Sequence, residues 1–546
     1  AAFLCITGVG LVSLNGSLTI TWGDLLSLGS ALFYALHIVA VNKLSDRRDI
    51  YLLTSLQFAF TALLAVIGGL LLQPFPAQAL SQPGVFWPNG MQRDEDYCET
   101  GLRLSRMGKA GVTCLDCHDP HTGTLKLPQE DNTLCMRCHG TGEAVNGVKA
   151  PVIDISKHTP CPQSSMGARC VECHMPESLY MARDPRRDHS FNSPDPLLSV
   201  ELGIPNACTM CHRDKSNEWA AEAVKKYYGP DPKMAKYRDR TRAVQHAYEG
   251  KEDVLPLLME CFRKEEVGAW RATLLDLMDS WAHEPAVQEL AAGAVNDPDA
   301  LTRAAAAKVM GRANNPSAGK LLNDPLKVVR LQAEWALRDS LPPDSPGMKE
   351  LTAAALHQAD QPSGAMKLAQ IAISRKDARA AEQWFAKALK WDATSSVVHR
   401  DYAVFLASQG RSGEAVEQMR EAVRLAPRDA NLWYLLGLGQ IENNDEPGAL
   451  QSFDEALKIE PAFIRALFNR ALLNEKVGRL EQAIQDLENC SSLDKENPDI
   501  PFTLAVMLYR NGHYRDAAAA AAETLRREPR HAQARQILES ASRHGK

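Results

Sequence analysis

A five-residue pattern that recurs four times between residues 114 and 212 constrains this chain most. Each copy has two cysteines three positions apart and a histidine directly after the second cysteine. The cysteines are Cys114, Cys117, Cys135, Cys138, Cys170, Cys173, Cys208 and Cys211, and the histidines are His118, His139, His174 and His212. Two thiols at this spacing can bond both vinyl groups of one porphyrin, and the adjoining histidine then lies under the iron as its proximal ligand. The pattern therefore predicts four covalently attached haem c groups, each with its iron.

Structural zinc is the alternative interpretation, because paired cysteines also build tetrahedral thiolate sites. Zinc does not require a histidine directly after every pair. The chain has only 15 histidines in 546 residues, so four such histidines favour haem over zinc.

The second axial ligand of each iron decides what a haem can do. A further histidine or a methionine closes the iron for electron transfer, whereas an open position permits small-molecule chemistry. His121, His158 and His189 are the candidate distal ligands. Four haems need four distal ligands, so one iron is open, is bound by a methionine such as Met107 or Met166, or takes a ligand from a segment upstream.

Residues 91–229, which carry all four motifs, are rich in Pro and Gly and poor in apolar residues. Such a segment cannot bury a conventional core, so the haems would supply one. Cys98 and Cys161 flank the motifs and either pair or stay as thiols. Haem c is attached outside the bacterial cytoplasm, which predicts a periplasmic location or one on the outer side of the membrane. The net charge of −6 gives no reason to expect a nucleic-acid partner.

The N-terminal 72 residues contain three apolar stretches, at about 1–14, 25–41 and 51–72. The last two have the length and low charge of membrane spans. A basic loop at 43–50 is expected in the cytoplasm, so the third span would leave the membrane on its outer side. Residues 1–72 are therefore predicted to be a partial transmembrane segment that could anchor the chain, and the Pro- and Gly-rich residues 73–90 a linker.

The run from Gly23 to His37 (GDLLSLGSALFYALH) resembles the EamA-like drug/metabolite transporters. Members of that family have about ten spans, and only some 75 residues match here. The resemblance therefore implies a fusion remnant or an assembly artefact that acts as an anchor at most.

Residues 233–341 show helical periodicity and a short internal sequence repeat. Asp297-Pro298 leads into Arg303, and Asp324-Pro325 leads into Arg330, an offset of 27 residues. The segment resembles HEAT-like helical repeats, with Asp-Pro opening a helix.

Residues 365–546 have a period of 34, which is typical of tetratricopeptide repeats. Small residues recur at this spacing, and larger ones follow four positions later. The two series are Ala381, Ala415, Ala449, Ala483 and Ala517, then Phe385, Met419, Phe453, Leu487 and Ala521. Pro427, Pro461 and Pro529 mark helix starts, and Gly437 occupies a position of close helix packing. The segment resembles the tetratricopeptide family and ends in a predicted capping helix after Arg530.

The surroundings of the CxxCH motifs, such as Gly111 to His121, Asn132 to His139 and Arg187 to Phe191, resemble the doubled-CxxCH cytochromes. These are related to tetrahaem electron carriers of nitrifying bacteria and often carry C-terminal tetratricopeptide repeats. The resemblance implies the same proximal histidines and makes His121, His158 and His189 distal ligands. It covers about residues 85–546.

We therefore expect a mainly α protein, in which a loop-rich, haem-packed cytochrome module precedes an α-solenoid. The leading functional prediction is electron transfer, with the repeats docking a redox partner protein. An oxidoreductase that acts on a small nitrogen or sulfur compound at one open haem is the alternative, although no catalytic residue stands out. A repeat scaffold with accessory haems is the third hypothesis.

Overall fold

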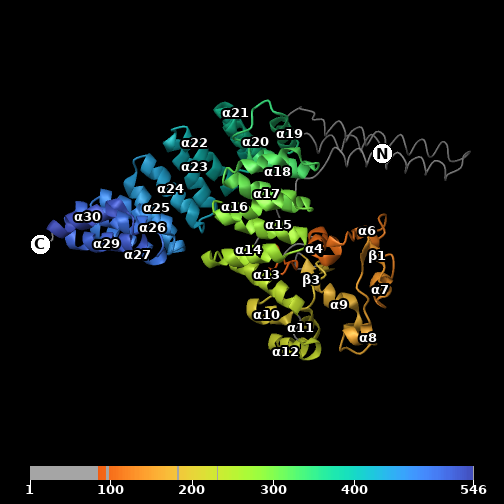
Figure 1. The fold of residues 1–546 in the computed structure, drawn as a ribbon. Helices are drawn as coiled ribbons and strands as arrows, with labels where there is room; N and C mark the ends of the chain where they lie inside the picture. Colours follow the sequence, from red (N-terminus) through yellow and green to blue (C-terminus); the bar gives the residue numbers. More distant parts are fainter. Residues whose placement is uncertain (1–83, 94–97, 181–183, 230–231, 545–546) are drawn as a thin grey trace, which may run out of the picture. The chain divides into compact units, whose positions relative to one another are not determined.

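The computed structural model describes residues 84–93, 98–180, 184–229 and 232–544 (Figure 1). The predicted transmembrane segment 1–72 and most of the predicted linker 73–90 lie outside these ranges. Within the described residues, no helix is both long and apolar enough to cross a membrane.

The chain forms two compact units. The first ends at Leu277 and adds the short stretches Pro298–Thr302 and Pro325–Val328. The second contains the rest of the chain from Met278 onward. The four CxxCH motifs lie in the first unit and the 34-residue repeats lie in the second.

Short helices and two small hairpins carry the CxxCH motifs. The helices are α4 (Cys98–Leu104), α5 (Arg106–Lys109), α6 (Cys114–Cys117), α7 (Thr133–His139), α8 (Ile155–His158), α9 (Cys170–His174), α10 (Pro196–Leu202), α11 (Ala207–Cys211) and α12 (Asn217–Tyr228). One hairpin pairs β1 (Ala144–Val145) with β2 (Val148–Lys149), and the other pairs β3 (Glu177–Tyr180) with β4 (Asp184–Arg187), both antiparallel. A small cluster of buried apolar residues, Met91, Leu198 and Ile204, packs here. This agrees with the expectation that the segment buries little apolar surface of its own.

Three longer helices complete the first unit: α13 (Pro232–Tyr248), α14 (Leu255–Lys264) and α15 (Gly268–Leu277). The indole N–H of Trp270 in α15 donates to the carbonyl of Leu104 at the end of α4, at 3.0 Å. The guanidinium of Arg240 lies 3.8 Å from the centre of the Trp270 ring. Its second partner is the buried Glu265 carboxylate, at 2.9 Å. These contacts fix α4 against α13 and α15.

Two arginines on α13 hold the segment around α10. Arg238 donates two hydrogen bonds to Asp195, at 2.7 and 2.9 Å, and the Asp195 side chain is only 5% exposed. One turn later, Arg242 makes the same bidentate contact with the half-exposed Glu201, at 2.9 Å for both bonds. The motif-bearing segment is thus tied to the longer helices by ion pairs as well as by packing.

The helices from Pro285 to Leu356 contain the predicted internal repeat. They are α16 (Pro285–Gly293), α17 (Ala300–Arg312), α18 (Lys327–Ala336) and α19 (Pro346–Leu356). Arg303 donates to the carbonyl of Asp297 at 2.8 Å and to the carboxylate of Asp324 at 2.7 Å. Arg330 repeats the arrangement on the carbonyl of Asp324 and the carboxylate of Glu350, at 2.8 and 2.9 Å. The two Asp-Pro steps therefore build one repeated local structure.

The C-terminal half is a stack of helix pairs with the predicted period. Its helices are α20 (Pro362–Ser374), α21 (Ala378–Trp391), α22 (Ser396–Ser408), α23 (Ser412–Leu425), α24 (Ala430–Glu442), α25 (Glu446–Ile459), α26 (Ile464–Lys476), α27 (Leu480–Leu493), α28 (Asp499–Arg510), α29 (Tyr514–Arg527) and α30 (Ala532–His544). Every member of the two predicted series is at most 5% exposed. The pattern therefore marks the core, and α30 is the predicted final helix.

Candidate haem sites

Each CxxCH motif folds as about one helical turn. The amide of His118 donates to the carbonyl of Cys114 at 2.8 Å, and that of His212 donates to Cys208 at 2.7 Å. In the second and third motifs, the amide of the residue after the histidine donates in the same way. Gly140 donates to the carbonyl of Met136, and Met175 donates to the carbonyl of Val171. One turn brings the two thiols and the imidazole of a motif to neighbouring positions. None of the eight cysteines forms a disulfide.

Three of the four motif histidines have one ring nitrogen engaged by a backbone carbonyl. The Nδ1–H of His118 donates to Gly123 at 2.9 Å, that of His139 to Pro151 at 3.0 Å, and that of His174 to Asn192 at 3.1 Å. A bond at Nδ1 fixes the tautomer and the ring orientation, and leaves the Nε2 lone pair for a metal. These rings are therefore set up as ligands through Nε2.

The surroundings of His174 and His212 have further features. Burial, followed by the charges of His158 and His139, lowers the pKa of His174, which keeps that imidazole neutral as a ligand must be. The ring of His212 packs against the indole of Trp219, with centroids 5.1 Å apart.

Two of the predicted distal ligands face motif histidines. The ring centroids of His118 and His189 are 6.4 Å apart, with 30° between the planes. Those of His158 and His174 are 5.9 Å apart, with 20° between the planes. Imidazoles bound on opposite sides of one metal, each at about 2 Å, have centroids about 6 Å apart. The separation in both pairs thus suits an iron between the rings.

The third candidate, His121, is exposed in the turn after the first motif. Its backbone N–H donates to the Asp119 carboxylate at 2.9 Å. Its role as a ligand stays a prediction. In the described part of the chain, the structure pairs neither His139 nor His212 with a second imidazole ring.

The four motifs follow one another in space in the order of the sequence. Burial, then the charge of Asp116 and that of Cys138 in the second motif, raise the pKa of Cys117. Interaction with the neighbouring Cys170 thiol, together with burial, raises the pKa of Cys135. This contact joins the second motif to the third.

The third and fourth motifs are also neighbours. Burial first, and then the charges of Cys208, Cys161 and Cys211, raise the pKa of Cys173 to about 11. Porphyrins attached at these thiols would therefore be adjacent along the whole series.

A buried asparagine braces the second motif against the third. Asn132 precedes α7 with a left-handed backbone (φ 65°), which Asn tolerates better than most residues. Its side-chain N–H donates to the carbonyl of Ala168 at 2.9 Å, and its side-chain oxygen accepts the N–H of Cys170 at 2.8 Å. This residue fixes the spacing of two motifs, and sequence reasoning missed it because nothing but its place before Thr133 distinguishes it.

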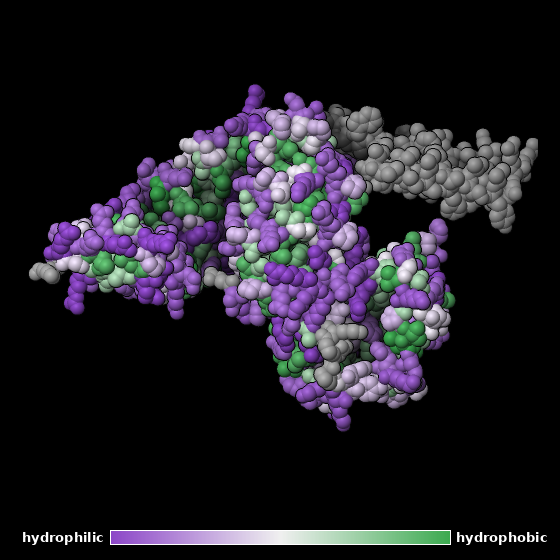
Figure 2. Space-filling model, viewed as in Figure 1, coloured by the Kyte–Doolittle hydropathy of each residue, from purple (hydrophilic) through white to green (hydrophobic). Residues whose placement is uncertain are grey.

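Apolar side chains lie exposed around the motifs. Leu115 is 55% exposed, Val152 67% and Met166 56%. Figure 2 shows apolar residues at the surface in the region of α6 to α8. Exposed apolar groups beside a poor core are the surroundings that a large apolar cofactor would cover. The residues present therefore fit covalently bound haem, which supplies one-electron redox chemistry when bound.

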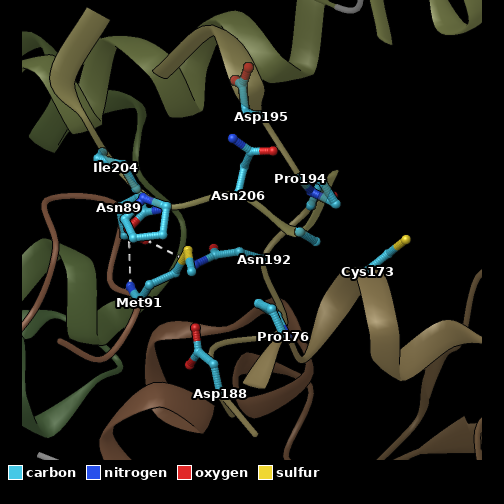
Figure 3. Close-up of a pocket in the computed structure, with 13 residues that line it drawn as sticks. Asn89, Met91, Cys173, Pro176, Asp188, Asn192, Pro194, Asp195, Ile204 and Asn206 are labelled. Atoms are coloured by element: carbon cyan, nitrogen blue, oxygen red, sulfur yellow. Dashed lines mark hydrogen bonds between the residues drawn. The ribbon is translucent and has the colours of Figure 1, made fainter. Parts of the chain in front are cut away.

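A small cavity separates the third and fourth motifs, between Cys173 and Asn206 (Figure 3). Asn192 lines it and supports the His174 ring through its carbonyl. Its side-chain amide donates to the carbonyl of Asn89 at 3.2 Å and to the hydroxyl of Ser190 at 2.8 Å. The cavity wall thus holds a candidate ligand in place.

Other sequence expectations have mixed outcomes. The guanidinium of Arg187 binds Glu172 at 2.9 Å and Glu177 at 3.2 Å. Cys98 and Cys161 form no disulfide. Among the described residues, no three His, Cys, Asp or Glu side chains converge as they would around a metal ion.

Family models match three parts of the chain. A model described as "Doubled CXXCH motif" matches residues 108–144, and two tetratricopeptide repeat models match residues 406–463 and 475–541. These matches confirm the paired motif and the repeats.

Curated relatives match about a fifth of the chain or less. Protein FlbA of Caulobacter vibrioides is 33% identical over 107 residues, which are 20% of this chain and 17% of FlbA. The peroxisomal targeting signal receptor of Kluyveromyces lactis is 28% identical over 99 residues, 18% of this chain and 17% of the receptor. A lipoprotein NlpI homolog of Haemophilus influenzae is 30% identical over 101 residues, which are 18% of this chain and 32% of the lipoprotein. The chain spans less than a third of the length of each of these relatives.

Similar solved structures include MamA, at 17% identity and a TM-score of 0.30 over 32% of this chain and 96% of MamA. A tetratricopeptide repeat protein from Parabacteroides merdae is 15% identical, with a TM-score of 0.31 over 34% of this chain and 74% of that chain. The protein thus carries a doubled CXXCH motif, which indicates covalent haem c binding, together with tetratricopeptide repeats, which indicate docking of a protein.

Proposed function

We propose that this chain is a periplasmic multihaem cytochrome c that passes electrons along four haems. Its helical repeats would hold it against a redox partner protein. The observation that carries the proposal is the spatial order of the motifs, since the cysteines of each CxxCH turn lie close enough to those of the next to shift their pKa values.

Irons with two protein ligands favour electron transfer over catalysis on a small molecule. The first iron would be held by His118 and His189, and the third by His174 and His158, because the ring centroids of each pair lie at a separation that suits two axial ligands. A second imidazole leaves no position for a substrate. The eight motif cysteines would form the thioether bonds.

The repeats support a partner. Tetratricopeptide stacks form extended surfaces for other proteins. A relative named as a peroxisomal targeting signal receptor is 28% identical to this chain over 99 residues. We assign residues 365–546 to the repeats, residues 233–341 to HEAT-like repeats and residues 91–229 to the haem module. A relation to nitrifier tetrahaem cytochromes and an anchor within residues 1–72 belong to the same proposal.

An oxidoreductase acting on a small nitrogen or sulfur compound is the second candidate. One observation favours it: in the described part of the chain, His139 and His212 face no second imidazole. An open iron at either position would admit a ligand such as nitrite or hydroxylamine.

The test removes one haem at a time from the full chain matured with haem. Replacing Cys135 and Cys138 by serine deletes the second haem and should interrupt the series, so that rapid reduction of the remaining haems splits into a fast and a slow phase. The control replaces Cys208 and Cys211, which deletes the terminal fourth haem and should leave the fast phase single. If both variants equilibrate as the unaltered protein does, electrons do not follow this series. Turnover of nitrite or hydroxylamine by the unaltered protein would instead support the oxidoreductase.

A further inference from the structure

The turn that carries His158 has little to hold it in place from its own sequence. Helix α8 is four residues long, and His158 and Lys157 are both exposed. Within the turn, the Asp154 carboxylate accepts from the N–H of Ser156 at 3.1 Å and from its hydroxyl at 2.6 Å. Isolated single turns are unstable in water, so the position of the His158 ring must depend on contacts from elsewhere.

Two tyrosines from the end of α12, 70 residues later in the chain, supply such contacts. The hydroxyl of Tyr228 donates to the carbonyl of His158 at 2.8 Å. The hydroxyl of Tyr227 donates to the carbonyl of Lys157 at 3.3 Å. Their rings pack edge to face, with centroids 4.8 Å apart and 77° between the planes. The tyrosines therefore hydrogen-bond to the backbone of the turn at two successive residues.

Helix α12 is a firm support for these tyrosines. The hydroxyl of Ser216 caps its start by accepting the N–H of Trp219 at 3.2 Å, and Ala220 in its first half is fully buried. Asn206, at the start of the fourth motif, donates to the side chain of Asn217 at 3.0 Å. The helix is thus attached to the fourth motif at one end and to the His158 turn at the other.

We propose that Tyr228 is a positioning residue that holds His158 over the iron of the third haem. Tyr228 touches neither the iron nor His174, and acts through the backbone of the His158 turn. The proposal rests on the proposed function, in which His158 and His174 are the two axial ligands. It adds that ligation at the third haem depends on the helix that follows the fourth motif.

The test measures carbon monoxide binding to the reduced, haem-loaded full chain, because carbon monoxide binds an iron only where the distal position is vacant, and each variant is compared with the unaltered protein. Tyr228→Phe keeps the ring and removes the hydroxyl. A single net hydrogen bond is worth about a fivefold change in such an equilibrium, so the Tyr228→Phe protein should bind carbon monoxide about fivefold faster. Tyr227→Phe is the matched control, and its longer bond predicts a smaller increase.

A double variant separates positioning from general loosening of the fold. His158→Ala should open the third iron fully, and adding Tyr228→Phe to it should change nothing more. An additive effect would overturn the proposal, because Tyr228 would then act elsewhere. If His158→Ala opens an iron and Tyr228→Phe is silent, the positioning role alone is wrong. If His158→Ala leaves carbon monoxide binding unchanged, the axial assignment is wrong as well, and the positioning role falls with it.

Discussion

Two glycines on α24 should respond oppositely to the same substitution. A Cβ atom on Gly437 would lie 2.6 Å from a ring carbon of Phe453, well inside the ordinary contact range of 3.4–4 Å. Phe453 is fully buried, so its ring has no free space to move into. Forcing a methyl group into a packed core costs about 1–3 kcal/mol, against about 1 kcal/mol gained when alanine replaces glycine inside a helix. Gly437→Ala should therefore destabilise the repeats by up to about 2 kcal/mol.

Gly439 lies two residues further along the same helix and is the matched control. The nearest atom to its Cβ would be a methyl of Val416 at 3.5 Å, an ordinary contact. Gly439→Ala should therefore keep the helix-propensity gain of about 1 kcal/mol without a clash.

Hydrogen exchange of α24 and α25 in the full chain, followed by mass spectrometry, measures both effects as local opening. Exchange should be up to about 30-fold faster in the Gly437→Ala protein and about fivefold slower in the Gly439→Ala protein, at about 1.4 kcal/mol per tenfold. A shift of both variants in the same direction would show that the close approach to Phe453 does not determine packing here.

Three further predictions concern the first unit. Arg238→Ala leaves the buried Asp195 carboxylate without its partner and should lower the free energy of unfolding by about 2–3 kcal/mol. Arg242→Ala on the same helix removes a more exposed ion pair and should lower it by under about 1 kcal/mol. Denaturation followed through the haem absorbance measures both, and equal losses would contradict the burial argument. Burial raises the pKa of Glu265, but its guanidinium partner and two backbone amides outweigh burial and hold the pKa below its usual range. The stability that Glu265 contributes is therefore present above the unfolded pKa of about 4.3 and is lost as the pH falls through the folded pKa. Glu265→Gln should make the free energy of unfolding less dependent on pH in this acidic range. An unchanged pH dependence would refute this. His189→Ala should convert one low-spin haem to a high-spin form, and a spectrum altered instead by His121→Ala alone would reverse the two roles.

The repeats could be predicted almost completely because their signal is local and periodic. Ala381, Phe385 and their counterparts at steps of 34 are buried in the structure as expected, since one helix pair buries the same positions in every repeat. Gly437 was predicted at a site of close packing, and the Phe453 ring is what approaches it.

The haem module could be predicted only in part. The CxxCH spacing gives the thiols and the proximal imidazoles because these residues are neighbours in the chain. His158 and His189 could be named as distal candidates, but their pairing with His174 and His118 could not be predicted, because no periodicity links these histidines to the motifs. The roles of Asn132 and Tyr228 could not be predicted, because their contacts are made with backbone atoms, which leave no trace in the pattern of side chains.

The central claim is that four covalent haems form one connected series in this chain. The most direct measurement is the intact mass of the full chain matured in a c-type expression host, combined with its pyridine haemochrome spectrum and its paramagnetic resonance. We expect four thioether-bound haems and low-spin signals from the irons held by His118 with His189 and by His174 with His158. A chain that matures without covalent haem, or that binds zinc at the paired cysteines instead, would contradict the account.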